Sequence, residues 1–174
     1  DAWRKGTVEE RLSHALVHEV VYQNLLLSRR TELHERAGRA LELAAGAHPE
    51  RLSDLEALGH HWSLSPDKPK GASYLVAAGD WGRAVYANDD AIRHYERALR
   101  TLADCDGCDE LAQVARERLG DLLGLTGRRA EALGHFEAVR AAIEAGADGA
   151  GTARLHRKIG GLHWEAGDRE RAGA

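Results

Sequence analysis

Residues 119–137, LGDLLGLTGRRAEALGHFE, repeat in altered form the pattern of residues 78–96, AGDWGRAVYANDDAIRHYE. Small, aromatic and acidic positions recur together at an offset of 41 residues: Gly79, Ala91, His94, Tyr95 and Glu96, then Gly120, Ala132, His135, Phe136 and Glu137. A third copy begins 40 residues later at Gly160 and extends to Ala172. Such a period is typical of a stack of helical hairpins, each covering the apolar face of the next. Stacks of this kind usually bind partners and rarely perform chemistry.

The composition fits one helical domain. The chain has 174 residues, only three prolines and a net charge of -4, with both signs interspersed. A chain of this length buries roughly 70% of its unfolded surface, so it needs no metal or disulfide to hold it together. The mild charge argues against a nucleic-acid surface, which requires a concentrated basic stripe. No apolar run reaches the ~20 residues of a membrane helix. With only two cysteines and no signal peptide, we expect a cytoplasmic setting.

Apolar periodicity and loop composition predict an all-α fold, a right-handed superhelical stack of about four to five antiparallel hairpins. The expected helices cover about residues 8–27, 30–45, 49–62, 70–86, 88–102, 110–125, 130–145 and 152–165, with a ninth from about 168. Pro49 is expected in a first helical turn, and Asn88 or Asp89 as a helix cap. The chain lacks methionine and ends partway into a repeat, so we interpret it as a piece of a longer protein.

The recurring glycines have a packing explanation. Gly79, Gly120 and Gly160 fall in the middle of expected helices, where glycine costs about 1 kcal/mol relative to alanine. A stack offsets that cost if each glycine admits a neighbouring helix. The recurring alanines would be the complementary small positions, and Tyr95 and Phe136 would fill the space between hairpins.

This pattern resembles the tetratricopeptide repeat, which has small residues at its eighth and twentieth positions and an aromatic at its twenty-fourth. The match covers about residues 70–174. It is best at Leu119-Gly120, Gly127, Ala132 and Phe136, and it continues at Ile159-Gly160, Gly167 and Ala172. In the unit containing Gly79, Tyr86 stands where a turn glycine is expected. The period exceeds the 34 residues of the family, which implies longer helices or loops.

The N-terminal third resembles a segment of large bacterial STAND/AAA-type ATPase regulators. The residues that carry this resemblance are His14-Ala15-Leu16, Tyr22, Leu25-Leu26, Arg29-Arg30, Leu33-His34, His60-His61-Trp62 and Tyr86-Ala87-Asn88-Asp89-Asp90-Ala91-Ile92. In those regulators a P-loop ATPase precedes such a segment, tetratricopeptide-like repeats follow it, and some members carry an adenylate or guanylate cyclase or a helix-turn-helix. The resemblance implies ATPase-linked hairpins over residues 1–69 and tetratricopeptide-like repeats over residues 70–174, in one continuous solenoid.

No catalytic motif is present in the sequence. There is no Gly-x-x-x-x-Gly-Lys-Ser/Thr, so any ATPase or cyclase activity would lie outside this chain. We expect no enzyme activity, no catalytic residue and no cofactor.

The histidines and cysteines leave a metal or redox function open. His14 and His18 are spaced like two zinc ligands on one helical face, but a packed helix edge explains them as well. His60 and His61 point in different directions on a helix, and we expect them to share no metal. Cys105 and Cys108 form Cys-x-x-Cys in a loop, which suits half a zinc site, a redox pair or an incidental disulfide. We predict no bound metal, and a structural role at the hairpin surface for His94 and His135.

In the tetratricopeptide family the first helix of each hairpin lines the concave face. Carried over by position, the resemblance implies a partner-binding groove formed by Val76, Asp80, Arg83, Glu117, Asp121, Arg157, Lys158 and Trp164. The expected partner is a protein or peptide segment or a neighbouring domain of the parent chain, with no direct nucleic-acid or membrane contact. A homodimer through the truncated last hairpin is a further possibility.

Three functions remain open at this point: the regulatory interaction arm of a signalling ATPase or transcription regulator, a stand-alone scaffold, and a metal- or redox-responsive domain that uses Cys105 and Cys108.

Overall fold

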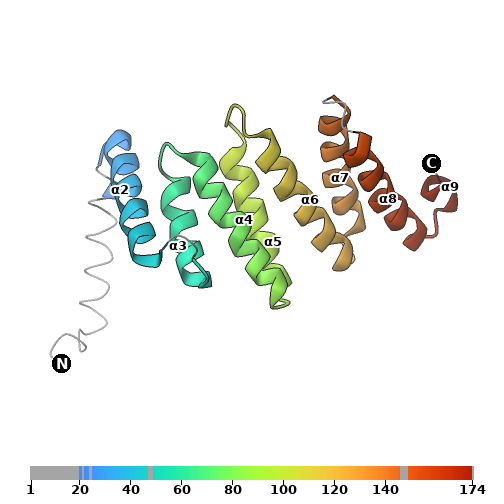
Figure 1. Cartoon of the computed structure of the whole chain (residues 1–174), viewed down its shortest axis with the longest axis horizontal. Helices are drawn as coiled ribbons and strands as arrows, with labels where there is room; N and C mark the ends of the chain where they lie inside the picture. Colours follow the sequence, from blue (N-terminus) through green and yellow to red (C-terminus); the bar gives the residue numbers. More distant parts are fainter. Residues whose placement is uncertain (1–19, 21, 24, 47–48, 146–148, 174) are drawn as a thin grey trace.

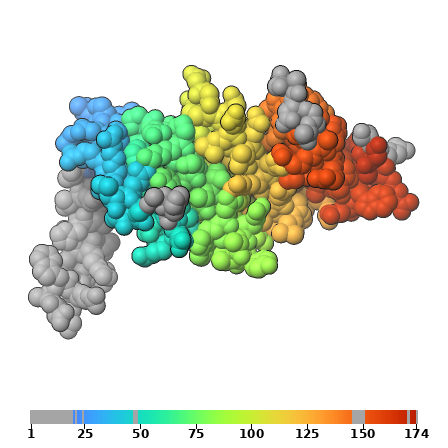
Figure 2. Space-filling view, viewed as in Figure 1, coloured from blue at the N-terminus to red at the C-terminus, as the bar shows by residue number. Residues whose placement is uncertain are grey.

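The computed structural model describes residues 20, 22–23, 25–46, 49–145 and 149–173. Within these ranges the secondary structure is helical, and no strand occurs. The helices are α2 (Leu27–Ala45), α3 (Leu52–Ser63), α4 (Lys68–Ala84), α5 (Asn88–Leu102), α6 (Asp109–Leu125), α7 (Arg129–Ala145), α8 (Gly149–Glu165) and α9 (Arg169–Ala172). They follow one another in a row from the N-terminal to the C-terminal end (Figure 1). The space-filling view in Figure 2 has the same elongated outline.

Each helix packs mainly on its sequence neighbours, so the chain forms hairpins α2/α3, α4/α5, α6/α7 and α8/α9. Contact between α4 and α6 adds a direct link between the first helices of two successive hairpins. One buried apolar cluster runs through this stack from Ala72 on α4 to Leu162 on α8. The predicted fold class, an all-helical stack of antiparallel hairpins, is confirmed.

Most helix boundaries agree with the sequence prediction, and the exceptions concern the helix starts. Pro49 was expected in the first turn of a helix, but α3 begins only at Leu52. Pro69 occupies that position in α4, where the Asp67 carboxylate accepts a hydrogen bond from the Lys70 backbone N–H at 3.2 Å. Asn88 is the first residue of α5 rather than its cap, since Ala87 is the residue at the N-cap. The helix predicted over residues 8–27 lies almost entirely outside the described residues.

The recurring glycines sit against the recurring aromatic rings. A Cβ atom added at Gly79 would lie 2.5 Å from Tyr95 Cε1, and one added at Gly120 would lie 2.7 Å from Phe136 Cε1. Both rings are almost completely buried. The alanine of the repeat faces a different glycine: a Cβ at Gly82 would lie 3.2 Å from the Ala91 Cβ. The expected close approach of helices is therefore present, but the ring, and not the alanine, covers the mid-helix glycine.

The turn inside each hairpin requires a left-handed residue. Gly127 and Gly167 hold this position in two hairpins, with φ of 82° and 80°. In the α4/α5 hairpin the equivalent residue is Tyr86, with φ of 62°, and its side chain is 86% exposed. A residue with a Cβ is strained by roughly 1–2 kcal/mol in this region, and the exposed ring has little packing to compensate.

We therefore expect Tyr86→Gly to raise the free energy of unfolding by about 0.5–1 kcal/mol, the strain relief being partly offset by the greater freedom of glycine in the unfolded chain. Tyr86→Ala is the matched control, because it removes the ring and keeps the Cβ. Urea unfolding followed by circular dichroism measures both variants. If the Tyr86→Gly protein is no more stable than Tyr86→Ala, the backbone at Tyr86 is not strained as described.

Candidate partner-binding face of the first helices

The first helices of successive hairpins are joined by ion pairs that recur with the repeat. Arg118 on α6 pairs with Asp80 on α4. One unit further on, Lys158 Nζ on α8 lies 2.6 Å from Asp121 Oδ1 on α6. The two carboxylates are 41 residues apart and the two cations 40, the same offsets as the glycine repeat. The exposed surface shared by α4, α6 and α8, here called the first-helix face, therefore has a repeated charge pattern.

Glu117 strengthens the link between α6 and α8. Its carboxylate accepts from Arg154 Nη2 at 2.9 Å, and its other oxygen lies 2.9 Å from Lys158 Nζ. Lys158 is thus held by two carboxylates, Glu117 and Asp121. Partly exposed pairs of this kind contribute at most about 1 kcal/mol each, so their main effect is to order the side chains on this face.

The aromatic ring under each first helix also contacts these charges. The Tyr95 hydroxyl donates a hydrogen bond to Asp80 Oδ1 at 2.7 Å. Burial raises the pKa of Tyr95 to about 12, so the hydroxyl keeps its proton and remains a donor at neutral pH. In the next unit Phe136 replaces the tyrosine, and Lys158 Nζ lies 5.5 Å from the centre of its ring. The ring and the ion pair are thus parts of one repeated arrangement.

A hollow of about 440 Å³ opens on the first-helix face between α6 and α8. Its lining combines charged, glycine and apolar residues: Gly120, Asp121, Gly124, Leu125, Gly127, Arg129, Phe136, Arg157, Lys158, Gly161, Leu162 and Glu165. Gly120 and Gly124 are covered by Phe136 and Leu162, but at Gly127 and Gly161 an added Cβ would meet nothing within 4 Å, so a ligand's backbone could approach the chain closely there. Arg129 Nε is 3.7 Å from Glu165 Oε2, a loose pair. Arg157 is exposed and forms no ion pair with any described residue.

The hollow gathers only part of the predicted groove. Asp121, Arg157 and Lys158 line it, and Glu117 lies beside it through its bond to Lys158. Asp80 belongs to the neighbouring ion pair with Arg118.

The remaining three predicted groove residues lie elsewhere. Val76 is only 5% exposed and belongs to the core, so its prediction as a contact residue is wrong; it stands one repeat before Glu117 but faces inward. Arg83 is exposed near the end of α4. Trp164 is 65% exposed near the end of α8, with the Arg169 guanidinium 5.8 Å from its ring centre.

Sequence reasoning missed Arg118 and Arg154, which pair with two of the predicted residues, and Gly124 and Gly161 in the lining of the hollow. A usable signal was present for Arg118, because it precedes Lys158 by 40 residues just as Asp80 precedes Asp121 by 41. No comparable repetition marks Arg154.

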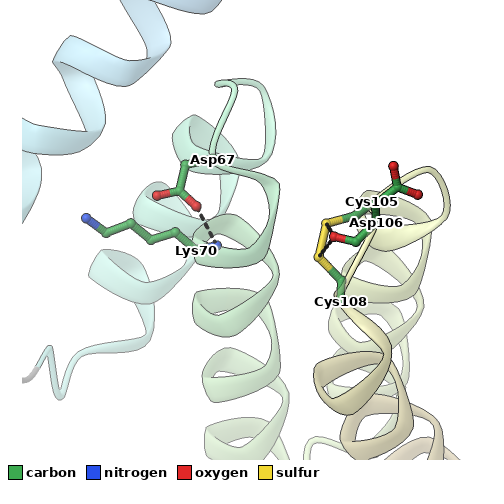
Figure 3. The surroundings of a disulfide bond; sticks show 5 residues. All are labelled: Asp67, Lys70, Cys105, Asp106 and Cys108. Carbon is green, nitrogen blue, oxygen red and sulfur yellow. Dashed lines mark hydrogen bonds between the residues drawn. A yellow bond between two sulfur atoms is a disulfide. The ribbon is translucent and has the colours of Figure 1, made fainter.

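The Cys-x-x-Cys loop lies at the other end of α6 from the hollow. Cys105 and Cys108 form a disulfide between α5 and α6, and the Asp106 carbonyl oxygen lies 3.8 Å from Cys108 Sγ (Figure 3). Cys108 is 8% exposed and belongs to the core cluster. Within the described residues no three histidine, cysteine or acidic side chains are arranged to hold a metal ion. His14 and His18 lie outside the described residues.

The histidines of the repeat are more enclosed than predicted. His94 is 7% exposed, with Nε2 at 3.2 Å from Glu56 Oε1, so the prediction of a surface position is wrong for it. His135 is partly buried. Burial lowers the pKa of both, which keeps the rings neutral at neutral pH.

In the part of the chain that the structure describes, no helix combines the length and apolarity needed to cross a bilayer. No protein-family profile matches the sequence, and no curated protein is significantly similar to it. Among solved structures, the crystal structure of MamA is similar at 18% identity over 80% of this chain and 82% of that chain, with a TM-score of 0.48. The crystal structure of BtubC (BKLC) from P. vanneervenii is similar at 19% identity over 86% of this chain and 70% of that chain, with a TM-score of 0.46. Neither similarity bears on function.

Helical hairpins stacked in sequence order, with a glycine under an aromatic ring in two successive units, define a tetratricopeptide-like α-helical solenoid.

Proposed function

We propose that this chain is a protein-binding module whose first-helix face receives an extended segment of a partner. The observation that supports the proposal most directly is the hollow between α6 and α8, where Arg157 stands without an ion-pair partner among the described residues. Beside it Lys158 is already held by Glu117 and Asp121, so the hollow offers one available cation and several ordered charges.

The geometry favours an extended chain over a small molecule. The hollow is an open depression along two helices, and its lining mixes the cations Arg129, Arg157 and Lys158 with the carboxylates of Asp121 and Glu165. Small-molecule sites are usually more enclosed and more apolar. Open glycine positions at Gly127 and Gly161 beside charged side chains suit a peptide backbone that approaches the glycines while its side chains reach the charges. Charges that are ordered before binding reduce the entropy lost on association.

Selection from a library of random linear peptides tests this proposal even though the partner is unidentified. We expect selected peptides to carry an acidic residue and to lose at least about tenfold in affinity for Arg157→Glu, because a charged hydrogen bond contributes about 1.5–3 kcal/mol. Arg100→Glu on α5 is the matched control: the same exchange at an exposed arginine, whose ion pair to Glu96 at 3.8 Å is loose. Fluorescence anisotropy gives the affinities.

Equal affinity of the selected peptides for wild type and Arg157→Glu would place their binding site elsewhere. A library that yields no binder to wild type, under conditions in which a known peptide-binding domain yields them, would count against peptide recognition altogether.

We further propose that the module is the regulatory interaction arm of a larger cytoplasmic signalling ATPase or transcription regulator, with ATPase-linked hairpins over residues 1–69 and repeats over residues 70–174. Its support is the sequence resemblance, from His14-Ala15-Leu16 to the Tyr86-Ala87-Asn88 segment. Under this proposal catalysis belongs to other domains, and pairing of two copies through the last hairpin is a further expectation. A P-loop motif upstream of Asp1 in the parent reading frame is the expected finding. A start codon close to Asp1 would leave the stand-alone scaffold.

The redox-responsive domain is a second candidate, favoured by the disulfide between Cys105 and Cys108. The bond closes the loop that joins two successive hairpins, and Cys108 is part of the core, so a change in the thiol state would act where the hairpins meet.

A further inference from the structure

Three histidine rings meet where α2 packs on α3. His34 Nδ1 on α2 lies 2.9 Å from His61 Nδ1 on α3, and the two ring centres are 5.1 Å apart. The His60 ring stands edge-on to both, with centres 5.6 Å from His34 and 5.1 Å from His61. The Tyr22 hydroxyl lies 2.9 Å from the other nitrogen of His34. Residues 27 positions apart in the chain thus form one cluster.

The contact between the two Nδ1 atoms sets a condition on protonation. A hydrogen bond between ring nitrogens needs one donor and one acceptor, and a protonated imidazole has only donors. At least one of His34 and His61 must therefore be neutral. If both were charged, the bond would be replaced by repulsion between two cations at contact distance, with His34 only 8% exposed.

Among the described residues, the charged group that acts on the cluster from outside is a cation, Arg97. The hydroxyl of Tyr22, which precedes α2, faces His34, and the Arg30 guanidinium of α2 lies 4.9 Å from the Tyr22 ring centre. From α5 the Arg97 guanidinium acts on His60. The carboxylate of Glu56, one turn before His60 on α3, contacts His94 instead. No carboxylate of the described residues is among the groups that shift the pKa values of the three rings.

Burial is the largest cause that lowers the pKa of each ring. The pKa of His34 is lowered further by the charges of His61 and His60. The pKa of His60 is lowered further by Arg97, and that of His61 by His60. Because the docked rings have lowered pKa values, docking is favoured at a pH where the rings are neutral. That stabilisation is complete above the ordinary pKa of 6.5 and is lost as the pH falls below it, because the released rings take up protons first.

Other contacts of α2 with described residues involve Gly38 and Glu42. Gly38 lies on the Trp62 ring, so closely that an added Cβ would be 2.8 Å from Trp62 Cε2. Glu42 accepts from the Tyr74 hydroxyl at 2.7 Å and pairs with Lys70 at 2.8 Å. Among the described residues the main core cluster begins at α4, so the contact of α2 with α3 lies outside that cluster and can open without disrupting it.

We propose that the contact between α2 and α3 is a pH-responsive junction: in mild acid α2 leaves α3, while the hairpins from α4 onward stay folded. Undocking uncovers the apolar face of α3 that carries Trp62, which is 3% exposed in the docked state. The junction does not depend on the partner-binding face, since its residues lie on other helices.

Hydrogen–deuterium exchange of the full chain, with a metal chelator present, tests the proposal at about pH 7.5 and about pH 5.5. After correction for intrinsic rates, we expect exchange of α2 amides to rise at least about tenfold in acid, since each ring that charges on release contributes up to a factor of ten per pH unit. Exchange of the amides in α4 and α5 should change far less. Equal acceleration in α2, α4 and α5 would indicate global loosening and overturn the proposal.

Two variants test whether the acid opening of α2 comes from the three histidines. His34→Gln combined with His60→Asn and His61→Asn keeps neutral hydrogen-bonding groups but removes titration, and α2 should then show no acid opening. His135→Asn removes another partly buried histidine whose pKa is lowered, and α2 should open as in wild type. Acid opening that persists in the triple variant would refute the assignment.

If the triple variant is already open at neutral pH, NMR titration of the wild-type histidines decides. At least two of His34, His60 and His61 should titrate below 6.5, and three rings titrating at or above that value would overturn the proposal.

Discussion

Replacement of Gly71 by alanine should be among the most damaging single-methyl changes in this chain. Gly71 lies in the first turn of α4, where that helix crosses the end of α3. A Cβ atom at this position would lie 2.6 Å from the Cα of Ser63 and 2.6 Å from the carbonyl carbon of Trp62. Both are backbone atoms, so no rotamer change relieves the overlap and the two helices must separate. We expect a loss of about 3 kcal/mol, the upper end of the usual range for overpacking.

Urea unfolding followed by circular dichroism measures this loss, and Gly134→Ala provides the control. Gly134 lies inside α7, and a Cβ added there meets nothing within 4 Å. The same exchange should therefore stabilise the protein by up to about 1 kcal/mol, through helix propensity alone. Gly71→Ala within error of Gly134→Ala would show that α3 and α4 do not approach as closely as described.

The second large effect concerns the glycine under the repeated aromatic ring. Gly120→Ala places a methyl group 2.7 Å from Phe136 Cε1, and the ring is 2% exposed, so it has little room to shift. We expect a loss of about 2 kcal/mol. Because the neighbour is a side chain, a smaller residue should relieve part of the overlap. Gly120→Ala in a Phe136→Leu background should therefore be less damaging, with a coupling free energy of about 1 kcal/mol.

A double-mutant cycle from urea unfolding measures this coupling. Gly161→Ala combined with Phe136→Leu is the control cycle, because a Cβ at Gly161 meets nothing within 4 Å. The two changes of the control should add. Additivity in the Gly120 cycle as well would mean that Phe136 does not cover Gly120, and the explanation of the repeat would then be wrong.

The repeat itself was readable from the sequence, because helix packing imposes local rules. Glycine under an aromatic ring recurs at Gly79 and Tyr95 and again at Gly120 and Phe136, since each hairpin meets its neighbour in the same way. Most helix boundaries were likewise predictable from turn residues such as Gly127 and Gly167. Even the irregular turn at Tyr86 was visible as a departure from the pattern.

The candidate site was only partly predictable. Positions carried over from the tetratricopeptide resemblance included Asp121, Arg157 and Lys158, which line the hollow between α6 and α8. The same resemblance placed Val76 in the groove, whereas it is in the core. Val76 is buried whereas Glu117, one repeat later, is only partly buried, so equivalent positions in successive repeats differ in exposure.

The amino-acid sequence by itself determined the helices, their order and the positions where they pack closely, since these follow from local periodicity and side-chain size. Only the tertiary structure decided which charges and rings meet. The pairing of Lys158 with both Glu117 and Asp121, and the contact of His34 with His61, join residues on different helices. The offset between two helices depends on the whole packed interface, and no pattern within either helix encodes it.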